Sequence, residues 1–178
     1  MPTLDTRGSQ RAARRWERET MESRSGAAAF PGAAEAPTHT GVWRFTVAPV
    51  DVSVPEVRHA VRDLIARRGA PLSRDAVDGA LLIVSELVTN AVRHAALLTP
   101  RIGVEVTLDA HWLRLSVEDG HPYRPKALHA DPDSQGTGGR GLLLVQATAL
   151  DAGGDCGVDA TATGGKVVWA ALPLDRAS

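Results

Sequence analysis

Residues 85–95 read Ser85-Glu86-Leu87-Val88-Thr89-Asn90-Ala91-Val92-Arg93-His94-Ala95, and this is the most informative run in the chain. It lies within a longer segment, from about Ser73 to Leu98, in which apolar residues recur at helical spacing. This spacing predicts a long helix with one apolar face. Glu86, Asn90 and His94 are four residues apart, so they lie along one edge of that helix. Such a polar column is either a solvent-exposed edge or part of a site.

Composition limits the classes of protein. With 178 residues, 43% of them hydrophobic, the chain can bury one substantial core. The net charge of −1 gives no electrostatic support for direct binding of nucleic acid or an anionic membrane. Cys156 is the only cysteine, which excludes an intrachain disulfide and favours a reducing compartment. Because the sequence also lacks an apolar run of ~20 residues that could cross a bilayer, we expect a soluble, cytoplasmic protein.

Residues 1–40 differ in composition from the rest. Arginines recur between Arg7 and Arg18, and residues 26–37 are rich in Ala, Gly and Pro. Such a segment has little to bury, so the sequence predicts a disordered basic tail over 1–40 and a folded domain over 41–175. An amphipathic arm that docks a partner or a lipid is the alternative for the tail.

Secondary structure can be predicted for most of the domain. Alternation predicts strands over 42–47, 102–108, 113–117, 156–161 and 166–172. Ser53 is placed to cap a helix that ends before Gly69. Ser73 is placed to cap the long helix, and Pro100 ends it. Residues 109–111 are short enough for a hairpin connection.

A long connection separates Asp119 from a glycine-rich segment. Asp119 stands where a strand opens into a loop, and residues 120–139 have no periodicity, which in a compact domain is typical of a functional or mobile connection. The connection ends in Gly136-Thr137-Gly138-Gly139-Arg140-Gly141, directly before a helix that begins at Leu142. Glycines at the start of a helix free backbone N–H groups that can bind an anion.

Together these motifs resemble the ATP-binding domain shared by gyrase, Hsp90, histidine kinases and MutL. The run from Glu86 to His94, an Asp that closes a strand, a long loop and a Gly-Arg-Gly-Leu helix start occur in the family's order and spacing. Within that family the chain is most similar to the small anti-sigma factors that act as serine kinases, especially actinobacterial ones. The resemblance covers roughly residues 42–172.

The resemblance implies a role for each motif. Asn90 would give its amide oxygen to Mg²⁺, and Glu86 would act as general base on the attacking hydroxyl. Asp119 would accept a hydrogen bond from the adenine amino group of ATP. The remaining site residues would surround the phosphates: Gly136, Gly138, Gly139, Arg140, Gly141 and Leu142 at the helix start, and Arg93 and His94 at the end of the long helix.

Two segments of the chain depart from the family pattern. The family's adenine loop often reads Asp-x-Gly-x-Gly, whereas here Asp119 is followed by Gly120-His121-Pro122-Tyr123. The family's last strand usually carries a Thr after a Gly-Lys pair, where its hydroxyl helps to hold the adenine region, and here Val167 takes that place. These departures leave open a site that binds nucleotide weakly or not at all.

Other interpretations of single motifs also stay open. The glycine run matches the dinucleotide fingerprint Gly-x-Gly-x-x-Gly, although a polar run precedes it instead of a strand. It could equally be a surface loop without a ligand, and Asp119-Gly120 is a common turn pair. The histidines show no ligand-like spacing with Cys156, so we expect no structural metal.

The expected fold is α+β, a two-layer sandwich of a mixed, mainly antiparallel sheet with helices on one face. The expected function is that of an ATP-binding serine/threonine kinase of the anti-sigma type, which phosphorylates an anti-sigma factor antagonist and regulates transcription by partner switching. A non-catalytic module that sequesters a sigma factor is the alternative from another class. The ATPase half of a sensor histidine kinase is disfavoured because no phosphoacceptor helix precedes the domain. The chain does not reveal its partner or whether it forms a homodimer.

Overall fold

The strands and helices of the domain follow one another in the order that the sequence predicts. The computed structural model describes residues 40–95, 98–122 and 140–175. Its strands are β1 (Gly41–Val47), β2 (Ile102–Leu108), β3 (Trp112–Asp119), β4 (Asp155–Ala160) and β5 (Lys166–Pro173). Its helices are α2 (Ser53–Arg68), α3 (Arg74–Ala95) and α4 (Arg140–Asp151). The predicted elements all form, with ends that differ by a few residues.

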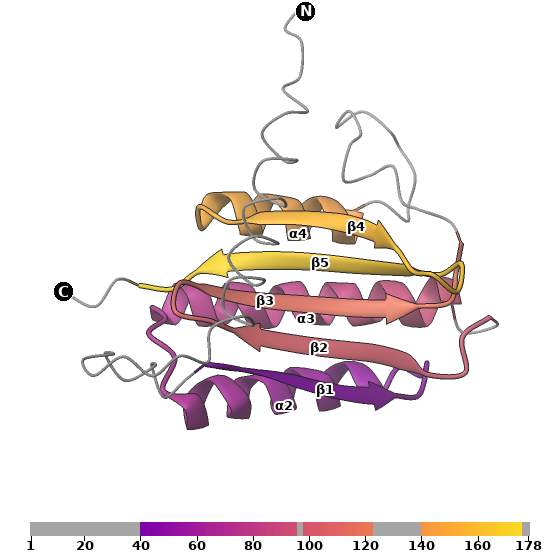
Figure 1. Ribbon diagram of the computed structural model, residues 1–178, viewed down its shortest axis with the longest axis horizontal. Helices are drawn as coiled ribbons and strands as arrows, with labels where there is room; N and C mark the ends of the chain where they lie inside the picture. The colour runs from indigo at the N-terminus through magenta and orange to yellow at the C-terminus, as the bar shows by residue number, and fades with distance from the viewer. Residues whose placement is uncertain (1–39, 96–97, 123–139, 176–178) are drawn as a thin grey trace, which may run out of the picture. The chain divides into compact units, whose positions relative to one another are not determined.

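The strands and helices form two layers. The five-stranded sheet has the order β1-β2-β3-β5-β4, and α2, α3 and α4 lie behind it on one face (Figure 1). All four strand pairings between the described residues are antiparallel. The predicted α+β sandwich is therefore confirmed, and the sheet, which the sequence left as mixed, is antiparallel throughout the described ranges.

The core between the layers sets the rotation of α3. Leu87, Val88 and Ala91 are at most 2% exposed and pack in the core with the inward-facing residues of β2 and β3. Full burial of a Val or Leu side chain stabilises a fold by about 1.5–3 kcal/mol, so this face of the helix is strongly held against the sheet. Glu86 and Asn90 consequently lie at the edge of the buried face, where both are half-buried.

Two predicted helix caps have different outcomes. The Ser73 hydroxyl accepts a hydrogen bond from the Ala76 N–H at 3.1 Å, so it caps α3 as expected. Ser53 does not cap α2: it is the first helical residue, and its buried hydroxyl donates to the Ala48 carbonyl at 2.7 Å. Because Ser53 lies within the helix, its hydroxyl is placed to donate to a carbonyl of the preceding turn, and it does not accept a bond from the first N–H groups of the helix.

Arg58 joins α2 to α3 next to the polar column. Its Nη1 donates to the Leu81 carbonyl at 2.8 Å and to the Ser85 hydroxyl at 3.1 Å. The Ser85 hydroxyl in turn donates to the same carbonyl at 2.7 Å. These bonds fix the residue that directly precedes Glu86.

The predicted basic tail, residues 1–40, lies outside the described residues except for Thr40, so the tail and the domain boundaries at 41 and 175 stay predictions. Within the described ranges, no helix has the length and apolar character needed to span a membrane.

Candidate functional site

The polar column of α3 faces the start of α4. Glu86 and Asn90 are half-buried, whereas Arg93 and His94 are exposed in the last turn of the helix. A Cβ atom added to Gly141, the second residue of α4, would lie 2.5 Å from Oε2 of Glu86. The backbone of α4 therefore passes directly over the Glu86 carboxylate, and only a glycine fits between them in this arrangement.

This contact joins two of the predicted site motifs. The first N–H groups of a helix have no partner within the helix, and negative charge is favoured beside them. The Glu86 carboxylate lies at this end of α4. The place predicted to bind phosphate is thus within reach of the predicted general base.

Asp119 lies buried at the end of β3. It is 4% exposed, and its Oδ1 accepts hydrogen bonds from the His121 N–H at 2.8 Å and from Lys166 Nζ at 2.9 Å. Lys166 is the direct cross-strand neighbour of Asp119 at the start of β5. Among the described residues, both donors to this carboxylate bind the same oxygen, so Oδ1 is held and Oδ2 remains for a ligand.

The backbone around Asp119 is packed closely. The Thr99 hydroxyl, which is buried, accepts a hydrogen bond from the Gly120 N–H at 2.8 Å. Gly165 approaches the Asp119 carbonyl and the Gly120 Cα so closely that a Cβ at this position would overlap both. A glycine is required here by the approach of two strands and not by a positive φ.

Sequence reasoning missed Lys166, Thr99 and Gly165. For Lys166 a signal was present: it occupies the inward position of the same alternation that places Val168, Ala170 and Leu172 in the core. A lone charged residue in an otherwise apolar alternation indicates a buried partner. Thr99 and Gly165 carry no comparable signal, because their roles depend on segments that are distant in the sequence.

Val167 does not face Asp119. It pairs with Glu118, so its side chain lies on the other side of the sheet, away from the helices. A hydroxyl at position 167 would not reach the adenine region, and the comparison of Val167 with the family's Thr was wrong. The inward residue that does face Asp119 is Lys166.

His121 also fits where a glycine was expected. Its backbone N–H binds Asp119, and no described residue other than glycine has a positive φ. The departure from Asp-x-Gly therefore imposes no strain on the backbone at this point.

The predicted phosphate-binding run is only partly described. Gly136, Gly138 and Gly139 lie outside the described residues. Arg140 is exposed at the start of α4, where its guanidinium can reach an anion. The Leu142 side chain is 1% exposed and belongs to the core, so only its backbone N–H could serve a phosphate.

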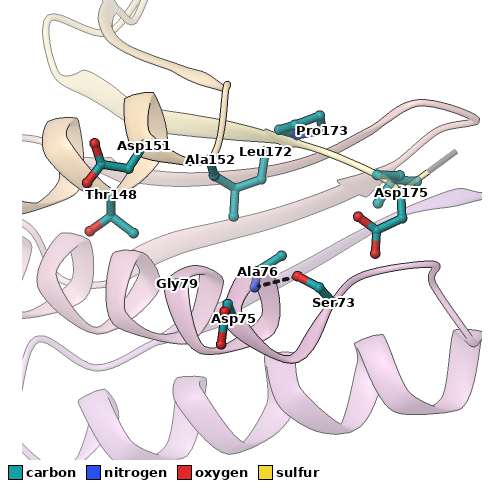
Figure 2. A pocket seen from close by; sticks show the side chains of 11 residues that line it. Ser73, Asp75, Ala76, Gly79, Thr148, Asp151, Ala152, Leu172, Pro173 and Asp175 are labelled. Atoms are coloured by element: carbon teal, nitrogen blue, oxygen red, sulfur yellow. Dashed lines mark hydrogen bonds between the residues drawn. The ribbon is translucent and has the colours of Figure 1, made fainter.

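A surface pocket of about 380 Å³ lies elsewhere (Figure 2). It is bounded by the start of α3, the end of α4 and the end of β5, and its lining includes Asp75, Asp151 and Asp175. No predicted site residue lines it. The predicted site is at the other end of α3.

The described residues contain no group of three or more His, Cys, Asp and Glu that could hold a metal ion. A half-buried amide oxygen such as that of Asn90 suits a Mg²⁺ ion that phosphate oxygens also hold.

A known protein family matches most of the domain. Residues 47–171 match the family model of the histidine kinase-like ATPase domain. The chain belongs to this family. Membership confirms the family resemblance and implies an ATP site. The buried acceptor at Asp119 and the glycine start of α4 beside Glu86 fit such a site, since one suits an amino group and the other an anion.

A solved structure shows the same fold. The RsbU and RsbW domains of Rv1364c from Mycobacterium tuberculosis are similar, with a TM-score of 0.56 and 21% identity over 78% of this chain and 34% of that chain. The chain thus spans about a third of that structure. A weaker match is the mycobacterial sensor histidine kinase MprB, with a TM-score of 0.46 and 21% identity over 74% of this chain and 97% of that chain. Another is the histidine kinase domain of the blue-light activated histidine kinase from Erythrobacter litoralis EL346, with a TM-score of 0.45 and 23% identity over 80% of this chain and 66% of that chain. A search of curated proteins gave no match.

Proposed function

We propose that the protein is an anti-sigma-factor-type serine/threonine kinase, which transfers the γ-phosphate of ATP to a partner protein. The observation that carries this proposal is the position of Glu86. Its carboxylate is half-buried, lies one helical turn from Asn90 and contacts the glycine start of α4. A base, a Mg²⁺ ligand and an anion site thus meet on one side of α3, as phosphoryl transfer requires.

Asp119 would select the base of the nucleotide. Its Oδ1 is held by Lys166 and by the His121 N–H, so Oδ2 would accept the hydrogen bond from the adenine amino group. A nucleotide anchored there would extend its phosphates toward the start of α4, where Arg140 adds positive charge.

In the transfer step, Glu86 would accept the proton of a serine or threonine hydroxyl. The hydroxyl oxygen forms a bond to the γ-phosphorus, the bond from this phosphorus to the bridging oxygen of the β-phosphate breaks, and ADP leaves. Asn90 would hold Mg²⁺ together with phosphate oxygens. When bound, the ion supplies positive charge that offsets the charge of the phosphates. Arg93 and His94 are exposed at the end of α3 and could contact the phosphates or the partner.

The proposed partner is an anti-sigma factor antagonist that carries the phosphorylated serine or threonine, and the proposed outcome is regulation of transcription in the cytoplasm by partner switching. The motif resemblance supports this assignment.

The alternative from another class is a non-catalytic module that sequesters a sigma factor. It was favoured by Val167 and His121. Val167 lies on the far side of the sheet, and His121 serves Asp119 through its backbone. Neither residue disables the site for a structural reason.

Calorimetric titration with Mg·ATP tests the proposal first, with Asn90→Ala as the variant that should weaken Mg²⁺-dependent binding. Transfer is then measured with labelled ATP and candidate antagonists. Glu86→Gln should keep ATP affinity and lower transfer by roughly 10²- to 10⁴-fold. Glu118→Gln is the matched control, because Glu118 is exposed on the other face of the sheet. ATP binding without transfer in the unaltered protein would support the non-catalytic module instead.

A further inference from the structure

Lys166 and Asp119 form an ion pair that is almost closed to solvent. Nζ lies 2.9 Å from Oδ1, and each side chain is only 3% exposed. The two residues are direct neighbours across β3 and β5, at the end of the sheet where the proposed nucleotide site lies. The pairing of β3 with β5 holds the two residues opposite each other, and both side chains are buried.

Stability alone does not account for this pair. Removing two charges from water costs several kcal/mol for each ion, and well-packed apolar residues often serve a core equally well. Val168, Ala170 and Leu172 do so at the next inward positions of β5. A charged pair at the first inward position therefore calls for another role.

The lysine also has donor capacity that the described residues do not use fully. An ammonium group carries three N–H donors. Within the described ranges, Nζ has one good acceptor, Oδ1 of Asp119 at 2.9 Å, and one at the limit of hydrogen bonding, the His121 carbonyl at 3.5 Å. An acceptor from a bound molecule would complete its hydrogen bonds.

Adenine offers the required pattern. Its Watson–Crick edge carries the 6-amino donor next to the N1 acceptor, whereas guanine carries an acceptor, O6, next to a donor, N1–H. The protein presents an acceptor, Asp119, beside a donor, Lys166. We infer that Lys166 is a specificity-determining residue that donates a hydrogen bond to N1 of adenine while Asp119 accepts one from the amino group. This inference rests on the proposed function, because it requires ATP to bind at Asp119.

The test compares ATP with 1-deaza-ATP, in which a C–H group replaces N1 and the amino group is kept. Calorimetry on the full chain should show that 1-deaza-ATP binds at least roughly tenfold more weakly, the range for a lost hydrogen bond to a charged group. Lys166→Met should weaken ATP binding by a similar factor and should bind both nucleotides equally. A purely structural lysine would change stability but leave the ratio of the two affinities as it was.

A second variant covers the case in which Lys166→Met fails to fold because Asp119 is left buried without its partner. The double variant Asp119→Asn/Lys166→Met removes both charges and keeps an amide oxygen for the amino group, and it should also bind the two nucleotides equally. Arg44→Met is the matched control, because it removes a cation from the exposed Arg44–Glu105 ion pair. This variant should keep the same ratio of ATP affinity to 1-deaza-ATP affinity as the unaltered protein.

Each outcome decides a different claim. If the unaltered protein binds ATP and 1-deaza-ATP equally, or if the lysine variants keep the full difference, the role of Lys166 is overturned while the proposed kinase stands. If the unaltered protein binds neither nucleotide, ATP binding itself fails, and the role of Lys166 falls with it.

Discussion

Oε2 of Glu86 lies 2.5 Å from the position that a Cβ on Gly141 would occupy, so α3 and α4 meet at this point through a carboxylate and a bare backbone. The distance between such a Cβ and Oε2 would be far shorter than an ordinary van der Waals separation. Any larger residue at position 141 must displace the carboxylate or the helix. Because the carboxylate is the end of a flexible side chain, it is the part that gives way.

Gly141→Ala should therefore affect activity much more than stability. Alanine is favoured over glycine in a helix by up to about 1 kcal/mol, which offsets the cost of turning Glu86 aside. A displaced general base should lower phosphoryl transfer by roughly 10²-fold or more. Thermal unfolding and transfer from labelled ATP are measured on the same preparation, and a variant that transfers phosphate normally would show that the position of Glu86 is not critical.

Gly79→Ala is the matched control for this variant. Gly79 lies on α3 and faces Thr148 of α4, with 3.2 Å between an added Cβ and the threonine methyl group. The substitution thus tightens the same pair of helices at the end away from Glu86. It should leave transfer unchanged, and an equal loss in both variants would assign the effect to helix packing in general.

Gly165→Ala should reduce both stability and nucleotide affinity. An added Cβ would overlap the Asp119 carbonyl and the Gly120 Cα, and backbone cannot move aside as a side chain can. Overpacking of this kind costs typically about 1–3 kcal/mol. Separating β5 from the end of β3 should also disturb Asp119, so ATP titration should show weaker binding alongside a lower free energy of unfolding.

Gly164→Ala separates these two effects. Gly164 has a φ of +86° and open space around it, so alanine there is strained but overlaps nothing. A residue other than glycine in the left-handed region costs about 1–2 kcal/mol. Gly164→Ala and Gly165→Ala should lower the free energy of unfolding by comparable amounts, and only Gly165→Ala should weaken ATP binding. If Gly164→Ala weakens binding equally, loss of stability alone explains both.

The sequence predicted the fold well because its periodicities are local. The apolar spacing of α3 and the alternation in β2, β3 and β5 each specify an element and its buried face, and the motifs indicated the family. The Ser53 cap failed because the sequence cannot show whether a serine precedes a helix or begins it. The site was predicted at Glu86, Asn90 and Asp119 from the resemblance of their motifs to those of the family.

The partners of Asp119 could not be predicted in the same way. Which residue of β5 faces it depends on strand register, and a shift by one residue exchanges Lys166 for Val167. The motif comparison chose Val167, on the wrong face of the sheet. Thr99 is reached only through the packing of two loops, which leaves no periodic signal in the sequence.

Thr99→Val should destabilise the domain by about 0.5–1.5 kcal/mol, because it removes the part-buried hydrogen bond from the Gly120 N–H to the Thr99 hydroxyl. Valine has nearly the same shape, so packing is preserved. Thr46→Val is the control: its hydroxyl accepts an exposed bond from Arg101 at 3.0 Å, and water can replace it. Urea unfolding of both variants should show a loss for Thr99→Val only, and equal free energies would mean that Gly120 finds another acceptor.

Cys156 should react slowly with alkylating reagents at neutral pH. Burial, with a smaller contribution from the negative charge of Asp155, raises the pKa of the thiol from 9.0 to about 11. The thiolate is the reactive form, so a rise of this size leaves roughly 100-fold less of it at neutral pH. The rate of reaction with iodoacetamide should therefore still be rising with pH above 9 in the folded protein.

The same reaction in guanidinium chloride provides the reference, since unfolding should return the thiol to its ordinary pKa. Asp155→Asn should lower the pKa of the folded protein only slightly, because burial is the larger cause. A folded protein whose alkylation rate levels off near pH 9 would show that the thiol is not held in its protonated form. Slow alkylation with the expected pH dependence would show that the folded protein holds the Cys156 thiol in its protonated form.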